Sequence, residues 1–187
     1  MPHQKLVIVV DNSNLFIEGA KYSAQKKGVF PKPGEKFAPQ DPTWRVDFGK
    51  LITVIANGRE IYEAILVGSR PPANDSVWNA AEASGFKVMV HDRNIKNKEK
   101  AVDTELVAQA TRSICKAPEK MDLAIVSGDR DFIPLVNVAQ EEGWEVEMWA
   151  WTNAFTEHGN MAQSVNHVNY LDDFFYKIGG CVNNLWP

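Results

Sequence analysis

The sequence contains few cysteines, and its two cysteines, Cys115 and Cys181, show no metal-ligand spacing. A cysteine-held metal centre is therefore not expected. Cys115 falls within an apolar helical pattern and is expected in the core. The four histidines do not cluster, and no serine–histidine or cysteine–histidine pair is evident, so no covalent enzyme intermediate is expected. We find no signal peptide, which makes a reducing cytoplasm the expected location.

Long apolar runs are also missing. The apolar run at the N-terminus, from Leu6 to Val10, is too short for a signal core or a membrane span, so no membrane association is expected. Internal repeats and long low-complexity linkers are absent as well. The 187 residues suit a single domain over 1–187, which is large enough to bury roughly 70% of its unfolded surface.

The sequence has no excess of positive charge, since its formal net charge is −4. This balance excludes a general surface for binding polyanions. Any contact with a nucleic acid must therefore come from a local basic patch or through bound metal ions.

Apolar runs bounded by turn residues alternate with helical patterns along the chain. Strands are predicted at 5–11, 61–69, 86–92, 121–129 and 144–151, and helices near residue 14 and at 47–56, 74–85, 102–116 and 131–143. Four prolines indicate a loop excursion at 21–45, and residues 179–187 are predicted to form a tail. The alternation predicts an α/β fold with a mostly parallel sheet covered by helices on both faces.

Aspartates stand where two of the buried strands end. Asp11 ends the first strand, while Asp129 and Asp131 occur in "SGDRD" after the strand at 121–129. Asp103 opens the helix at 102–116. Parallel sheets bind ligands beyond the carboxyl ends of their strands, where the strand order reverses. Asp11 and Asp129 would face each other there if their strands are neighbours.

Such a set of acids has two interpretations. Carboxylates crowded into one cleft raise one another's pKa or recruit cations. Their hard oxygens suit one or two Mg²⁺ or Mn²⁺ ions, which activate water and stabilise charge on a phosphodiester. Taken singly, Asp11 and Asp103 could instead cap helices, and Asp131 could interact with a helix dipole.

Three motifs occur in order along the chain: "VDNSNL", "KEKAVDTELVAQA" and "VSGDRDFIPLVNVAQEEGWEVEMWAW". Together they resemble the NYN domain family of the PIN-like nuclease superfamily, and most of all its LabA-like, limkain-type subgroup. The resemblance implies a three-layer α/β/α sandwich and a divalent-metal-dependent ribonuclease site. The acids that match are Asp11, Asp103, Asp129 and Asp131, and the secondary polar residues that match are Asn14 and Ser127.

Basic residues lie beside the proposed site. The loop "DRNIKNKEK" carries Arg93, Lys96, Lys98 and Lys100, and Arg130 stands between two of the acids. These residues could hold RNA phosphates while the metal ions act on one bond. Alternatively, the loop is simply solvated and Arg130 neutralises its neighbours.

Three tryptophans, Trp144, Trp149 and Trp151, fall on one predicted strand. Strand alternation puts Trp149 and Trp151 on one face and Trp144 on the other. They could stack on bases, but packing under helices or at a subunit interface is the favoured interpretation. A homodimer in which these tryptophans contribute to the interface is therefore one of the arrangements that the sequence allows.

The leading hypothesis is a metal-dependent endoribonuclease that hydrolyses phosphodiester bonds of single-stranded RNA. A non-catalytic, regulatory RNA-binding module of the same fold is the alternative. A metal-dependent phosphohydrolase of the haloacid dehalogenase type is less favoured, because Ser13 stands where that chemistry needs a second acid. An adhesion-type metal site is disfavoured because Leu15 stands where a second serine is needed.

Overall fold

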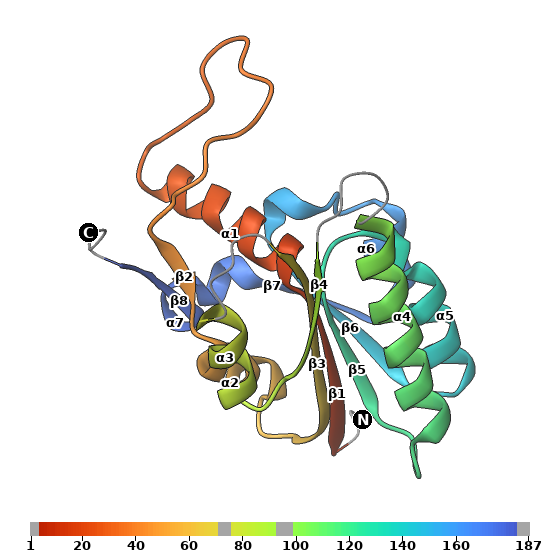
Figure 1. Ribbon diagram of the computed structural model, residues 1–187. Coiled ribbons are helices and arrows are strands. Elements are labelled where there is room, and N and C mark those ends of the chain that lie inside the picture. The colour runs from red at the N-terminus through yellow and green to blue at the C-terminus, as the bar shows by residue number, and fades with distance from the viewer. Residues whose placement is uncertain (1–3, 71–75, 93–98, 183–187) are drawn as a thin grey trace.

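The computed structural model describes residues 4–70, 76–92 and 99–182, and within these the side chains of 69–70, 91–92 and 99–103 are not described. Its core is a six-stranded sheet in the order β4-β3-β1-β5-β6-β7, in which every neighbouring pair is parallel (Figure 1). The six strands are β1 (Lys5–Asp11), β3 (Glu60–Arg70), β4 (Lys87–Asp92), β5 (Asp122–Val126), β6 (Glu145–Ala150) and β7 (His167–Tyr170). The helices are α1 (Asn12–Lys26), α2 (Phe48–Ala56), α3 (Ser76–Ala83), α4 (Glu99–Lys116), α5 (Ile133–Glu141), α6 (Asn160–Ser164) and α7 (Phe175–Ile178).

The central strands are apolar throughout because both faces of the sheet are covered. Every residue from Leu6 to Val10 in β1 is fully buried, and β5 is buried along its length. Successive side chains of a strand point to opposite faces. Accordingly, Leu6 and Ile8 pack in one hydrophobic cluster, and Val7 and Val9 pack in the other.

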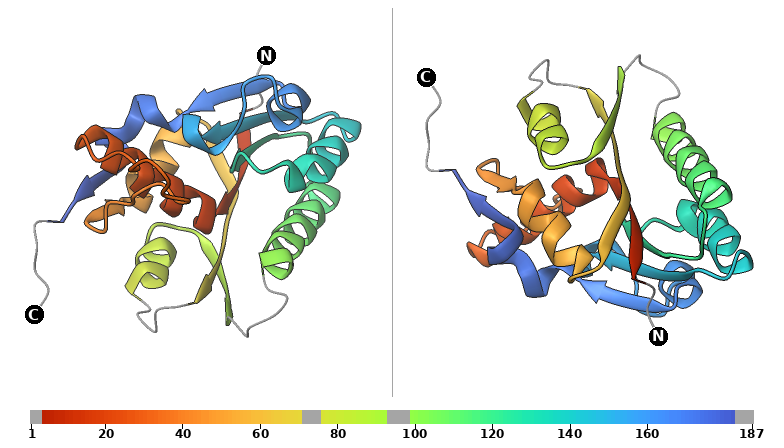
Figure 2. Two further views of the ribbon diagram at one scale, coloured as in Figure 1. Left: turned by 90° about the horizontal axis from the view of Figure 1, so that it is seen from above. Right: turned by 90° about the horizontal axis from the view of Figure 1, so that it is seen from below.

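Helices form a layer on each face of the sheet. The first cluster packs against α1, α2, α3 and α7, and the second packs against α4, α5 and α6. Figure 2 shows the two layers from above and below, with α4 and α5 (green to teal) on one side and α1 to α3 on the other. The predicted α/β sandwich with a central parallel sheet is therefore confirmed.

The tryptophans of the β6 region divide between the two layers as the alternation predicts. Trp149 and Trp151 pack in the cluster under α1 and α7, while Trp144 packs in the opposite cluster with Met148. All three tryptophans are buried. Packing, rather than base stacking, is therefore their role. Trp151 also donates its indole N–H to the carbonyl of Leu15, 2.9 Å away, which ties β6 to α1.

The segment predicted as a loop excursion at 21–45 is divided differently in the structure. Helix α1 continues to Lys26, because Ala20, Ser23 and Ala24 are buried on its inner face. Residues 27–43 contain no helix or strand and extend away from the body of the molecule (Figure 1). The excursion ends in β2 (Trp44–Val46), which pairs antiparallel with β8 (Gly179–Cys181), the start of the predicted tail.

Several other features differ from the sequence-based expectations. Beyond Trp151 no elements were predicted, yet the structure adds α6, β7, α7 and β8 there. Cys115 is exposed instead of lying in the core. It follows Ile114, the last buried residue of the α4 face, and one residue turns a helix by about 100° away from that face. No helix in the described part of the chain is both long and apolar enough to cross a membrane.

Candidate functional site

The candidate site lies where two central strands end side by side. β1 pairs in parallel with β5, and Val10 is opposite Val126, so Asp11 and Ser127 are the next residues on neighbouring strands. The chain leaves β1 towards β3 on one side and returns from α4 to β5 on the other. The strand order thus reverses at β1, the position where parallel sheets bind ligands. The two strands are therefore neighbours, which is the condition under which Asp11 and Asp129 were expected to face each other.

Asp11 is held firmly at this position. Its carboxylate caps α1, with Oδ1 accepting hydrogen bonds from the backbone N–H of Ser13 at 3.0 Å and of Asn14 at 3.2 Å. The hydroxyl of Ser127 donates to Oδ2 at 3.3 Å. The capping role that the sequence left open is therefore present, and it leaves Oδ2 directed to the neighbouring strand.

The surroundings of Asp11 disfavour its charge. Only 7% of the residue is exposed, and this burial is the main cause that raises the pKa of its carboxyl group. The charge of Asp129 raises it further, while the hydrogen bonds from Asn14, Ser13 and Ser127 act in the opposite direction. Among the described side chains, no cation forms an ion pair with Asp11. A buried carboxylate near a second acid is suited to a cation supplied from outside.

The loop after β5 arranges the second acid. The backbone N–H of Asp129 donates to the hydroxyl of Ser127 at 3.2 Å, and Asp129 in turn accepts from the N–H of Asp131 at 3.0 Å. This bond caps the short 3₁₀ helix η1 (Arg130–Phe132). Ser127 is buried, whereas Asp129, Arg130 and Asp131 are exposed. The buried hydroxyl therefore links the two strand ends, and the charged groups face solvent.

The remaining predicted residues are not all brought together. No three His, Cys, Asp or Glu side chains within the described set lie close enough to hold a metal ion. Asp131 thus does not join Asp11 and Asp129 in such a group. Asp103 and Lys100 lie on α4, but their side chains are not described. Arg93, Lys96 and Lys98 lie outside the described residues. The roles of these five residues stay predictions.

A pocket of about 420 Å³ opens next to Asp129. One wall consists of Asn14, Asp129 and Arg130, and the opposite wall comes from the chain after β6: Ala154, Phe155, Thr156, Gly159, Asn160 and Met161. This second wall was not predicted from the sequence. The available signal was its position: it follows another strand whose carboxyl end lies at the same edge of the sheet.

Gly128 lets the two walls meet. A Cβ atom at this position would lie 2.9 Å from both the carbonyl oxygen of Ala154 and the Cβ of Phe155. Phe155 also packs against the ring of Tyr170 on β7, with centroids 5.9 Å apart. The small residue in "SGDRD" therefore allows close packing that positions the aromatic wall over the acidic loop.

The sequence matches a known protein family, and the fold is similar to that of a known structure. Residues 5–171 match the NYN domain family model. The fold is similar to the crystal structure of a protein of unknown function from Vibrio parahaemolyticus, with a TM-score of 0.63 and 18% sequence identity over 90% of this chain and 93% of that one. Among curated protein sequences, none matches significantly. The chain therefore belongs to the NYN domain family, a nuclease-related family with a PIN-like fold.

Proposed function

We propose that the protein is a divalent-metal-dependent endoribonuclease that hydrolyses phosphodiester bonds of single-stranded RNA. One observation carries the proposal: Asp11 and Asp129 follow neighbouring strands and are linked through the Ser127 hydroxyl, which donates to Asp11 Oδ2 at 3.3 Å and accepts from the N–H of Asp129 at 3.2 Å. Family membership supports it, because NYN and PIN-like nucleases usually use divalent metals. The LabA-like, limkain-type subgroup is our proposed placement within the family.

The donor set fits Mg²⁺ or Mn²⁺. Asp11 and Asp129 would hold the ion, with Asp103 and Asp131 as further proposed ligands and Asn14 and Ser127 as secondary polar groups. A cation would neutralise the buried charge of Asp11, which has no cationic partner among the described side chains. When bound, the ion supplies activation of water and stabilisation of charge on the phosphate.

The chain's own residues would position the substrate. Arg130, which lies between Asp129 and Asp131 in the sequence, is exposed and lines the pocket. Its guanidinium is therefore available for a phosphate group. Asn14 and Asn160 offer amide groups, and Phe155 offers an aromatic wall. A pocket of about 420 Å³ suits one unstacked nucleotide, which supports single-stranded RNA as the substrate. Arg93, Lys96, Lys98 and Lys100 are proposed to bind phosphates further along the strand.

The test is cleavage of a panel of RNA and DNA oligonucleotides with Mg²⁺, with Mn²⁺ and with chelator. Cleavage of single-stranded RNA that requires metal and stops with chelator is the expected result. Asp129→Asn should abolish it while leaving the fold intact, because asparagine can still accept the hydrogen bond from Asp131. Glu142→Gln is the matched control, since this exposed acid follows α5 at the opposite edge of the sheet. No cleavage of any RNA, together with no metal binding, would refute the proposal.

A non-catalytic RNA-binding module is the second candidate. It is favoured by Arg130, which is exposed and lines the pocket, because a guanidinium can hold a phosphate group without any catalysis. Metal-independent affinity for RNA, with all the oligonucleotides left intact, would identify this function. Loss of cleavage in Asp129→Asn with unchanged RNA affinity would identify the nuclease.

A further inference from the structure

Residues 26–37, which we call the basic arm, form the most exposed part of the excursion. Every residue of the basic arm is exposed to solvent. Two of its side chains are aromatic: Phe30 is 65% exposed and Phe37 is 77% exposed. Exposed phenylalanines on a projecting segment mark a contact surface, because such groups are normally buried.

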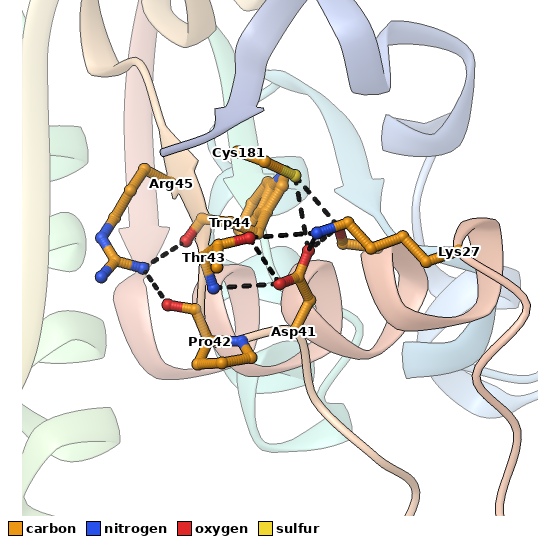
Figure 3. A network of polar contacts seen from close by, with 8 residues as sticks. Lys27, Asp41, Pro42, Thr43, Trp44, Arg45 and Cys181 are labelled. Carbon is orange, nitrogen blue, oxygen red and sulfur yellow. Dashed lines mark hydrogen bonds and ion pairs between the residues drawn. The ribbon is translucent and has the colours of Figure 1, made fainter. Parts of the chain in front are cut away.

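The base of the basic arm is closed by a buried carboxylate. Asp41 accepts hydrogen bonds from the hydroxyl of Ser23 at 2.6 Å and from the backbone N–H of Thr43 at 2.9 Å. Lys27 forms an ion pair with Asp41 at 2.7 Å, and Cys181 of β8 donates to the same carboxylate at 3.4 Å (Figure 3). These bonds join the end of α1, the end of the excursion and β8, so the excursion that carries the basic arm starts and ends at one fixed point.

The tip of the basic arm is closed as well. The N–H of Glu35 donates to the carbonyl of Lys32 at 3.0 Å, and the N–H of Lys32 donates to the Glu35 carboxylate at 2.9 Å. Gly34 supplies a φ of +88° in this turn, and prolines at 31 and 33 restrict the backbone. The basic arm therefore loses less conformational freedom on binding than an unrestrained loop of this length.

The charge of the basic arm is opposite to that of the chain. It contains four lysines and one glutamate, a formal charge of +3, whereas the whole chain has −4. Lys27 is engaged by Asp41. Lys26 lies over the ring of Tyr22 at 5.4 Å and Lys36 over the ring of Phe37 at 5.7 Å. Such exposed cation–π contacts are weak, so Lys26, Lys32 and Lys36 can still bind a ligand. A concentration of lysines on an otherwise acidic chain selects an anionic ligand.

The combination of lysines and phenylalanines narrows the class of anion. Lysines bind phosphates, and aromatic rings stack on bases that are not paired in a duplex. An acidic peptide would use the lysines alone. An anionic lipid surface could use both kinds of side chain, because phenylalanines insert below the headgroups, but membership of a nuclease-related family favours nucleic acid as the ligand of this chain. Single-stranded nucleic acid uses both kinds of side chain.

Helix α1 sets the distance between the basic arm and the candidate site. Asp11 caps its first turn, and the basic arm begins at its last residue, Lys26. Its 15 residues span about 22 Å at 1.5 Å per residue. A strand that connects the two places therefore covers roughly six stacked nucleotides at about 3.4 Å each.

We propose that the basic arm binds single-stranded RNA at a second place on the strand, several nucleotides from the bond positioned at Asp11 and Asp129. This inference rests on the proposed ribonuclease function for the identity of the nucleic acid. Phe30 and Phe37 stack on bases, and Lys26, Lys32 and Lys36 contact phosphates. The basic arm thereby gives long RNAs an affinity that short RNAs do not have.

The test measures RNA binding in chelator, so that cleavage does not interfere. Fluorescently labelled RNAs of about 5 and about 20 nucleotides are titrated with the full chain and with the double variant Phe30→Ala/Phe37→Ala. We expect the double variant to lose roughly tenfold or more in affinity for the long RNA and nothing for the short one. Tyr176→Ala is the matched control, because this aromatic residue is 82% exposed on α7 and should change neither affinity.

A second variant tests the lysines separately. Lys32→Ala/Lys36→Ala should reduce the slope of log affinity against log salt by about 1.4 for the long RNA, since each phosphate contact on a single strand contributes about 0.7. An unchanged melting temperature would show that both double variants are folded.

Equal affinity of the wild type and both double variants for the long RNA would overturn the inference. A dimer that dissociates in the phenylalanine variant, with RNA affinity unchanged, would also overturn it and make the basic arm a protein interface. Arm-dependent binding without cleavage would refute the nuclease proposal and leave the basic arm as an RNA-binding element. If the protein cleaves RNA but binds it equally well without the side chains of the basic arm, only the proposal about the basic arm is refuted.

Discussion

Replacing Asp11 separates its two roles, since the carboxylate both caps α1 and faces the candidate metal site. Asp11→Asn keeps an oxygen that accepts from the N–H groups of Ser13 and Asn14, 3.0 and 3.2 Å away, and removes the charge. Asp11→Ala removes the cap as well. Loss of an N-cap costs about 1 kcal/mol, so the alanine variant should be less stable than the asparagine variant by about that amount.

The sign of the pH dependence follows from the environment of Asp11. Burial, and then the charge of Asp129, raise the pKa of Asp11 in the folded protein. A raised pKa means that the folded state binds the proton more tightly than the unfolded state, whose aspartates titrate near pH ~3.9. The contribution of Asp11 to stability is therefore complete below that pH and is lost as pH rises through the folded pKa. In the presence of chelator, the free energy of unfolding of wild type should therefore decrease relative to that of Asp11→Asn as the pH rises.

Divalent metal ions should make wild type more stable than Asp11→Asn, the reverse of the order in chelator. A ligand that binds only the folded state at 100 times its dissociation constant adds about 2.7 kcal/mol to stability. Wild type should gain this amount with saturating Mn²⁺, while Asp11→Asn should gain much less and should not cleave RNA.

Urea unfolding of wild type and both variants between pH 4.5 and 8, followed by tryptophan fluorescence, measures these differences with chelator and with Mn²⁺. Differences between wild type and variant at each pH cancel the titration of all other groups. An Asp11→Asn variant that is less stable than wild type in chelator at neutral pH would refute the reasoning about its buried charge. An Mn²⁺ effect equal in wild type and variant would remove Asp11 from the metal site.

Three further predictions concern residues that stabilise the fold. Burial raises the pKa of Asp41, but hydrogen bonds from Lys27 and its other partners outweigh burial and lower the pKa. Asp41→Asn should therefore cost about 2 kcal/mol in urea unfolding at pH 7. This difference should shrink below pH ~4, where the carboxylate of the unfolded wild type becomes protonated. Gly19→Ala should lower the melting temperature, because its Cβ would lie 2.4 Å from the Trp44 ring, whereas Gly49→Ala, with its nearest atom at 3.5 Å, should not. Arg59→Met should cost about 3–5 kcal/mol in urea unfolding, because this largely buried guanidinium bridges two carboxylates; a loss under 1 kcal/mol would contradict a stabilising role.

Much of the fold could be predicted because its central strands have a strong signal. Continuous apolar runs in β1 and β5 are buried on both faces, and such runs have few other interpretations. The helices predicted at 102–116 and 131–143 correspond to α4 and α5. Leu106, Ala110 and Ile114 are buried on one face of α4, and Pro134 stands in the first turn of α5. The strand β7 was missed because His167 is exposed and its other three residues are only partly buried, so the sequence around it lacks a clear apolar period.

The site was predictable only in part, and for a physical reason. The proximity of Asp11 and Asp129 follows from two parallel strands ending at one edge, which sequence patterns can express. The wall formed by Phe155 comes from irregular chain, and its position depends on close packing against Gly128. Such packing is a property of three-dimensional shape, and no periodic pattern in the sequence reports it.

The pairing of β2 with β8 also bears on the order in which the chain folds. Val46 and Gly179 are partners although about 130 residues separate them, so this contact closes one of the longest loops in the molecule. During synthesis, β1 can pair with β3 and β5 long before β8 leaves the ribosome. Until then Trp44 lacks its covering strand, and Asp41 lacks the thiol of Cys181. The sheet that carries Asp11 can therefore form first, and the base of the basic arm becomes complete only at the end of folding.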